Sequence, residues 1–117
     1  MAPHLPKPKR YLVAAFLLGG ALAGIGSAGF SQTQHVISQK GREFTPNAIT
    51  IRRGETVQIV NDDGDLRHHV YVESDKFRFD SGDQEPGAKA NIAFLVDGKF
   101  DVLCAIHPKM KLSVVVK

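Results

Sequence analysis

The sequence predicts an all-β protein, a small Greek-key β-sandwich that follows an N-terminal targeting segment. From His35 onward, apolar and polar residues alternate in short runs, which is the period of half-buried strands. Gly, Asn and Asp residues separate these runs and mark turns. After residue 30 no stretch keeps a helical period for three turns, so we expect no helix in this part.

The first thirty residues have the features of a secretory signal peptide or of an uncleaved signal anchor. The first ten are Pro-rich and carry three Lys and Arg without an acid, the next twenty carry no charge, and small residues surround a cleavage position near Ala28. The apolar run is long enough to span a bilayer, so both alternatives stay open. Either way we expect the domain at residues 31–117 in the periplasm or another extracytoplasmic compartment.

The charge of the chain does not indicate a nucleic-acid partner. The chain has 15 Lys and Arg against 12 Asp and Glu, a net charge of +3, and three of these cations precede residue 29. The exported part is therefore neutral, and it carries no basic stripe with interleaved aromatic residues.

Strands are predicted in order along residues 31–117. Ile49 and Ile51 share one face, a turn follows at Arg53-Gly54, and Val57 and Ile59 share a face on the next strand. Alternation also predicts strands at 68–74, 76–80, 90–96, 98–104 and 111–117. Asp97-Gly98 stands between two of these runs and predicts a hairpin there.

Cys104, the only cysteine of the chain, ends one of these strands. Alternation puts it on the face of Phe100 and Val102, which is the core face, so we expect Cys104 to point inward. A lone thiol in an exported domain cannot form an intramolecular disulfide, so it is either buried and inert or occupied by a ligand.

A pair of histidines begins another strand, and alternation separates the two. His68 shares a face with Val70 and Val72, so His68 is expected to point into the core. His69 is expected to point outward or to support the site from behind.

The segment CAIHPKM, residues 104–110, returns over the same end of the sandwich because Pro108 cannot continue a ladder. A thiolate, two imidazoles and a thioether then lie together. Thiolate and thioether favour copper, and two His with one Cys and a weak axial Met form the blue-copper arrangement, whereas zinc does not recruit a thioether. The sequence therefore predicts one copper ion, cycling between Cu(I) and Cu(II), at His68, Cys104, His107 and Met110.

These segments resemble the copper-binding motifs of the cupredoxins. CAIHPKM is similar to the C-x2-H-x2-M ligand loop of amicyanins, and RHHVYV is similar to the H-N-V strand start of plastocyanins and amicyanins. FTPNAITIRRGETVQIVNDD resembles the stretch before that strand. The resemblance covers residues 35–117 and implies a cupredoxin fold, type 1 copper at the same four residues, and a one-electron carrier that is not an enzyme.

Two positions depart from the pattern of these families. His69 stands where Asn is common, and Arg67 stands where Pro is usual. A ring nitrogen of His69 can replace the hydrogen bond by which that Asn ties the two ligand loops together. We therefore expect the departures to change the tuning of the site and not its existence.

Other interpretations of these residues are weaker. Taken singly, Cys104 and Met110 fit buried core positions and His107 fits a surface loop, but four donors at one end favour a metal site. A Cys104 nucleophile paired with His107 lacks an oxyanion donor and an orienting acid. A binuclear copper centre needs a second cysteine, and a copper nitrite reductase needs a second site and a longer chain.

We expect a monomeric carrier that docks briefly with redox proteins such as a dehydrogenase, a cytochrome or an oxidase, and that touches a membrane only if the N-terminal segment is uncleaved. Ala105, Ile106 and Pro108 would form an apolar rim around His107. Charges of both signs would lie near it, so steering by either sign stays open: Lys109 and Lys111, and Asp62, Asp63 and Asp65. The alternative is a copper chaperone or accessory copper-binding protein of the same fold. The sequence has no Met- or His-rich tract, which favours the carrier.

Overall fold

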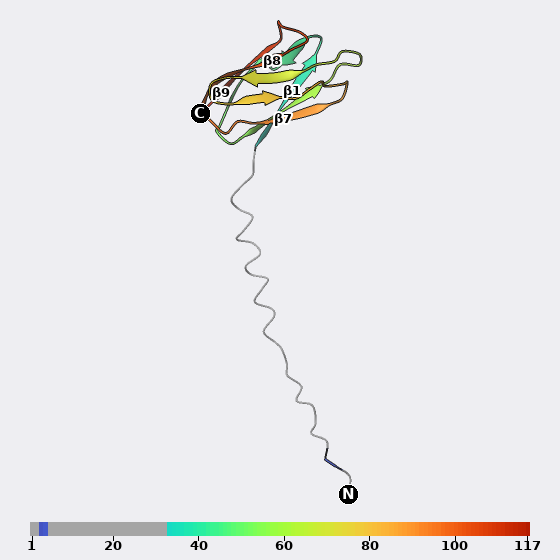
Figure 1. Ribbon diagram of the computed structural model, residues 1–117, viewed down its shortest axis with the longest axis vertical. Helices are drawn as coiled ribbons and strands as arrows, with labels where there is room; N and C mark the ends of the chain where they lie inside the picture. Colours follow the sequence, from blue (N-terminus) through green and yellow to red (C-terminus); the bar gives the residue numbers. More distant parts are fainter. Residues whose placement is uncertain (1–2, 5–32) are drawn as a thin grey trace. The chain divides into compact units, whose positions relative to one another are not determined.

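Nine strands follow one another in the computed structural model, which describes residues 3–4 and 33–117 (Figure 1). Their bounds are β1 Gln34–Lys40, β2 Glu43–Thr45, β3 Ala48–Ile51, β4 Thr56–Asn61, β5 Val70–Glu73, β6 Arg78–Asp80, β7 Lys89–Ala93, β8 Gly98–Cys104 and β9 Lys111–Val116.

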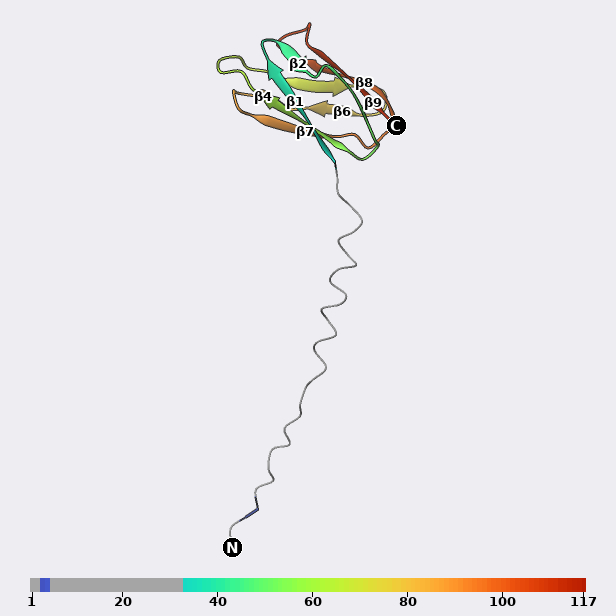
Figure 2. The same ribbon diagram turned by 180° about the vertical axis from the view of Figure 1, so that it is seen from behind.

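These strands form two sheets packed face to face, one of four strands in the order β2-β1-β4-β7 and one of five in the order β3-β9-β8-β5-β6 (Figure 1 and Figure 2). β1 pairs with β4 and β3 pairs with β9 in parallel, and the other neighbours are antiparallel. Only β1–β2, β5–β6 and β8–β9 are hairpins among the described strands, because every other connection crosses between the sheets. The predicted all-β sandwich is confirmed.

The core lies between the two sheets and follows the alternation of the strands. In β4, Val57 and Ile59 are fully buried. In β9, Leu112, Val114 and Val116 are buried, and the residues between them are only half-buried. The predicted shared face of Val57 and Ile59 is confirmed as a core face.

Three aromatic rings pack together in the core at a distance from Cys104. The ring of Phe77 meets those of Phe94 and Phe100 edge to face, with centroids 5.4 Å and 4.8 Å away. Phe100 precedes Cys104 by four residues on β8, which corresponds to about 13 Å along a strand. The aromatic cluster therefore supports the end of the sandwich opposite Cys104.

The predicted hairpin at Asp97-Gly98 is wrong. β7 pairs with β4 in one sheet, whereas β8 pairs with β5 and β9 in the other, so Asp97-Gly98 lies on a crossover. The strand predicted at 90–96 corresponds to β7, which ends earlier, at Ala93. Backbone hydrogen bonds then tie Phe94 to Gly54 and Glu55 in the turn before β4.

Two strands, β1 and β2, were not predicted. β1 buries Gln39 beside Ile37, and a glutamine in a core position breaks the apolar alternation that marks a strand. β2 has only three residues, too few to show a period.

The predicted targeting segment, residues 1–30, lies outside the described residues except for Pro3 and His4. Among the described residues, none forms a helix of the length and apolar character that crossing a membrane requires.

Candidate metal centre

Cys104 is the last residue of β8, and its free thiol is buried in the core. Its strand partner across the sheet is Val70 of β5. The backbone N–H of His69 donates a hydrogen bond to Cys104 Sγ at 3.4 Å. The sulfur therefore points inward, as alternation predicted, at the edge of the core where β5 begins.

His68 approaches this sulfur from the neighbouring strand. A two-way backbone bridge with Gln84 fixes the chain just before β5, since each backbone N–H donates to the carbonyl of the other residue. The His68 side chain is fully buried, and its Nδ1 lies 3.8 Å from Cys104 Sγ. His68 therefore points into the core, as alternation predicted.

His107 approaches from the loop between β8 and β9. Its Nδ1 lies 3.7 Å from Cys104 Sγ, and its ring is only partly buried. Burial lowers the pKa of His107, and the nearby His68 and Arg42 lower it further. The imidazole is thereby favoured in its neutral form, which is the form that binds metals.

These three side chains form one cluster. One donor atom from each of His68, Cys104 and His107 lies within 4.8 Å of the other two. The two imidazole rings meet at a centroid distance of 5.0 Å and an angle of 61°. Two ring nitrogens thus face one buried sulfur from two directions.

Met110, the fourth predicted ligand, closes the same loop. Its side chain is 2% exposed, and its backbone N–H donates to the His107 carbonyl at 3.0 Å. Met110 and His107 also line one surface hollow together. Met110 is therefore held close to the cluster along the chain, and its role as a ligand stays a prediction.

Backbone hydrogen bonds tie the two donor segments together. The N–H of Ala105 donates to the His69 carbonyl at 2.9 Å, and the N–H of His69 donates to Cys104 Sγ. The peptide groups of His69 thus hold the segment before β5 against the end of β8.

The ring of His69 points outward, as alternation predicted, but it does not make the hydrogen bond that was expected to tie the ligand loops together. It points away from the cluster, with Nε2 at 2.6 Å from Asp80 Oδ1 and Nδ1 at 3.1 Å from Asp83 Oδ1. The hydrogen bond to Asp80 is the main cause of a raised pKa of His69, and Asp83 adds to it. The tie between the ligand loops is therefore made by the backbone of His69, while its ring bonds to these two carboxylates.

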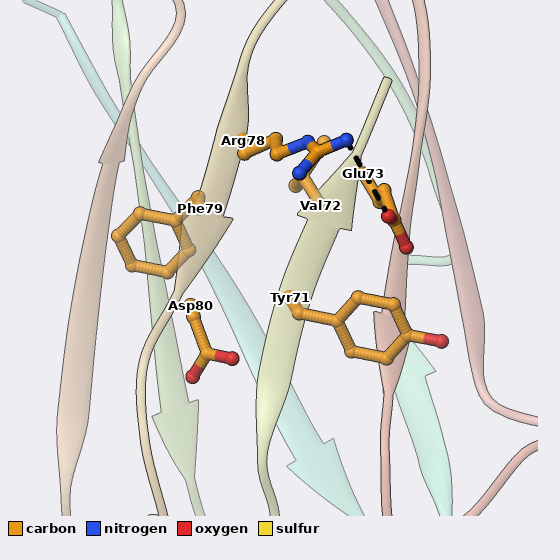
Figure 3. A pocket seen from close by; sticks show the side chains of 6 residues that line it. All are labelled: Tyr71, Val72, Glu73, Arg78, Phe79 and Asp80. Carbon is orange, nitrogen blue, oxygen red and sulfur yellow. Dashed lines mark ion pairs between the residues drawn. The ribbon is translucent and has the colours of Figure 1, made fainter. Parts of the chain in front are cut away.

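A hollow over β5 and β6 lies apart from the candidate centre (Figure 3). A weak ion pair crosses it, with Arg78 Nη2 at 3.9 Å from Glu73 Oε1. Asp80, which holds the His69 ring, lines it, but none of the four predicted ligands does. Its lining residues are Tyr71, Val72, Glu73, Arg78, Phe79 and Asp80.

Asp63 belongs to the site, although the sequence placed it among surface charges. Its Oδ2 lies 2.6 Å from His68 Nε2, and its side chain is 8% exposed. Burial acts to raise the pKa of Asp63, but hydrogen bonds from the Gly41 N–H and from His68 outweigh it, so the pKa is lowered. No sequence signal marked this role, because residues 62–67 lie in a loop without periodicity.

The donors of this cluster fit copper. A thiol that can ionise and two imidazoles provide the three strong ligands of a blue-copper site, and a buried thioether is close along the chain. A closed zinc site would require a fourth strong ligand, and the described residues supply only these three in one cluster.

Known proteins share this architecture. The family model for a Cupredoxin-like domain matches residues 11–116. No curated protein matches the chain.

Solved structures of copper proteins are similar to the chain. Amicyanin from Paracoccus versutus aligns with a TM-score of 0.66 and 25% identity, over 77% of this chain and 87% of that one. A Met-to-Ala mutant of amicyanin in the Cu(I) form aligns with a TM-score of 0.66 and 18% identity, over 77% of this chain and 88% of that one. A Cu-containing nitrite reductase from Thermus scotoductus aligns with a TM-score of 0.68 and 27% identity over 80% of this chain. The alignment covers only 24% of that longer protein.

Substituting each histidine of the pair separates their roles. His68→Ala should abolish tight metal binding, because it removes a buried donor that faces Cys104. His69→Ala should leave copper affinity nearly unchanged, because the backbone of His69 makes the tie to the cluster and its ring bonds only to Asp80 and Asp83. Titration of Cu(II) into each metal-free variant measures this, with circular dichroism as the check of folding. Retained binding in a folded His68→Ala and loss in His69→Ala would invert the assignment.

Proposed function

Since this chain belongs to the cupredoxin-like family, we propose that it is an exported mononuclear type 1 copper protein that carries single electrons between redox partners. The observation that carries the proposal is the convergence of Cys104 Sγ with the Nδ1 atoms of His68 and His107. An amicyanin whose length this chain nearly matches supports it.

His68, Cys104 and His107 would hold the copper ion, and Met110 would be its weak fourth ligand. Bound copper supplies a one-electron couple between Cu(II) and Cu(I). The contribution of the chain is to keep the donors in one place. Backbone hydrogen bonds at His69, Ala105 and Met110 fix the segments that carry these donors, so little rearrangement should accompany a change of oxidation state.

His107 is the donor through which we propose that electrons enter and leave. Cys104 and His68 are buried, whereas His107 is partly exposed beside the exposed residues Ile106 and Pro108. Ile106 is 44% exposed, one of three large aliphatic side chains that are exposed among the described residues, and the other two, Val36 and Leu95, lie outside the loop that carries His107. Such a small apolar rim suits brief docking of a redox protein over His107.

We propose a carrier and not an enzyme because the chain covers most of amicyanin but only a quarter of the nitrite reductase. Among the described residues, only one cluster of His, Cys, Asp or Glu side chains has metal-binding geometry. A carrier of single electrons needs one metal site.

We also propose that the protein works as a monomer outside the cytoplasm. The support for the location is the basic start of the chain and the uncharged run at residues 11–30. Sequencing the N-terminus of the native protein distinguishes a cleaved signal from an anchor, and an intact chain in the cytoplasm would contradict both.

Adding Cu(II) to the purified metal-free protein should give an intense blue colour from thiolate-to-copper charge transfer. Cys104→Ser should lose this band even where some copper binds, because a hydroxyl cannot supply the same transition. Visible spectroscopy at one equivalent of copper makes the measurement. A stoichiometric Cu(II) complex of the wild type with no strong visible band would refute the type 1 assignment.

Met110 should tune the redox potential more than it holds the metal. Met110→Gln should keep the blue colour and lower the potential, because a harder oxygen donor favours Cu(II), and Met110→Leu should raise it. Cyclic voltammetry measures both, and a reversible wave separates a carrier from a chaperone that holds Cu(I). If Met110→Leu changes neither potential nor spectrum, Met110 is a core residue and not a ligand.

A further inference from the structure

The buried carboxylate of Asp63 makes the shortest polar contact to the cluster. Asp63 Oδ2 lies 2.6 Å from Nε2 of His68, on the side of the ring that faces away from Cys104. The side chains are 8% and 0% exposed, respectively, so water competes little for this contact. Asp63 touches one of the three clustered donors directly and is not itself among them.

Asp63 is held in place from two sides. Its Oδ1 accepts the backbone N–H of Gly41 at 3.0 Å, and its own backbone N–H donates to Asn61 Oδ1 at 3.0 Å. The Asn61 amide in turn donates to the carbonyls of Leu66 and Gln84. Both carboxylate oxygens therefore have fixed partners, and the loop that carries Asp63 is fastened to the end of β4.

This contact decides which nitrogen of His68 carries the proton. An ionised carboxylate only accepts hydrogen bonds, so the hydrogen lies on Nε2 and is donated to Asp63. Nδ1 is then left with a free lone pair, and it is the atom that faces Cys104 Sγ. Asp63 thus presents His68 in the tautomer that can bind a metal next to the sulfur.

We propose that Asp63 is a positioning residue that orients His68 and biases the metal centre toward its oxidised form. The proposal rests on the proposed copper-binding function. A carboxylate behind a ligating imidazole fixes its orientation and raises its basicity, and a more basic ligand with a negative charge behind it stabilises Cu(II) more than Cu(I). The redox potential should therefore depend on a residue that does not touch the metal.

The neighbouring residue Asp62 provides a matched control. Asp62 is exposed and accepts a hydrogen bond from the Ser38 hydroxyl, so it has no contact with His68. Asp63→Asn and Asp62→Asn remove the same charge one residue apart. Asn keeps the shape of Asp but has one acceptor oxygen, so at position 63 it cannot accept from both Gly41 and His68.

The test compares the potentials and the copper affinities of the wild type and the two variants. Asp63→Asn should weaken Cu(II) binding about 10–100-fold and Cu(I) binding less. Its potential should rise by about 59 mV for each tenfold change in the ratio of the two affinities. Asp62→Asn should shift the potential much less, because solvent screens its charge. Equal potentials in Asp63→Asn and the wild type, or equal shifts in both variants, would overturn the proposal.

A second readout uses the metal-free protein. Nitrogen-15 NMR of the His68 ring should show the Nε2–H tautomer in the wild type and a mixture of tautomers in Asp63→Ala. An unchanged tautomer in a folded Asp63→Ala would overturn the positioning role. Failure of the proposed function looks different, since the wild type would then give no blue copper complex, and the bias of the metal centre would fail with it.

Discussion

One buried sulfur atom, Cys104 Sγ, is the point on which the candidate metal centre depends. A backbone N–H and two imidazole nitrogens face it from three separate places in the chain. A thiolate in an apolar core is costly unless hydrogen bonds or a metal compensate its charge. The surroundings of Cys104 offer one N–H donor and two imidazole nitrogens that could bind a metal with it, which distinguishes this thiol from a small apolar side chain that fills a core.

The sheets fix the positions of the donors. β5, β8 and β9 lie side by side, so the ladder pairs Val70 with Cys104 and Leu103 with Lys111, at the two sides of the cluster. The loop that carries His107 starts and ends on these strands. Strands of a sheet hold the residues of a site more accurately than free loops do. Asp63, itself held by Asn61, also contacts the His68 ring on the side away from Cys104. The result is a site whose geometry the protein determines.

Strand alternation explains what the sequence could predict. A period of two places Cys104 with Phe100 and Val102, and His68 with Val70 and Val72, so the meeting of the two side chains follows from their positions at strand ends. The two-sheet fold follows from the same period.

The failures lie where local pattern ends. The polar Gln39 conceals β1, and the apolar residues after Ala93 conceal the crossover at Asp97-Gly98. Asp63 and the ring of His69 find their partners through the folded loops, which no local period records. Such contacts join residues of different loops and form only in the folded chain, so a local sequence pattern cannot predict them.

The central claim is that the fold holds one sulfur and two imidazole nitrogens ready for a single copper ion. X-ray absorption at the copper edge, on the protein loaded with one equivalent of copper, tests it most directly. The account predicts one short copper–sulfur bond and two copper–nitrogen bonds in both the oxidised and the reduced sample, with only small changes between them. A copper ion surrounded only by nitrogen and oxygen, or a coordination shell that differs greatly between the two states, would contradict it.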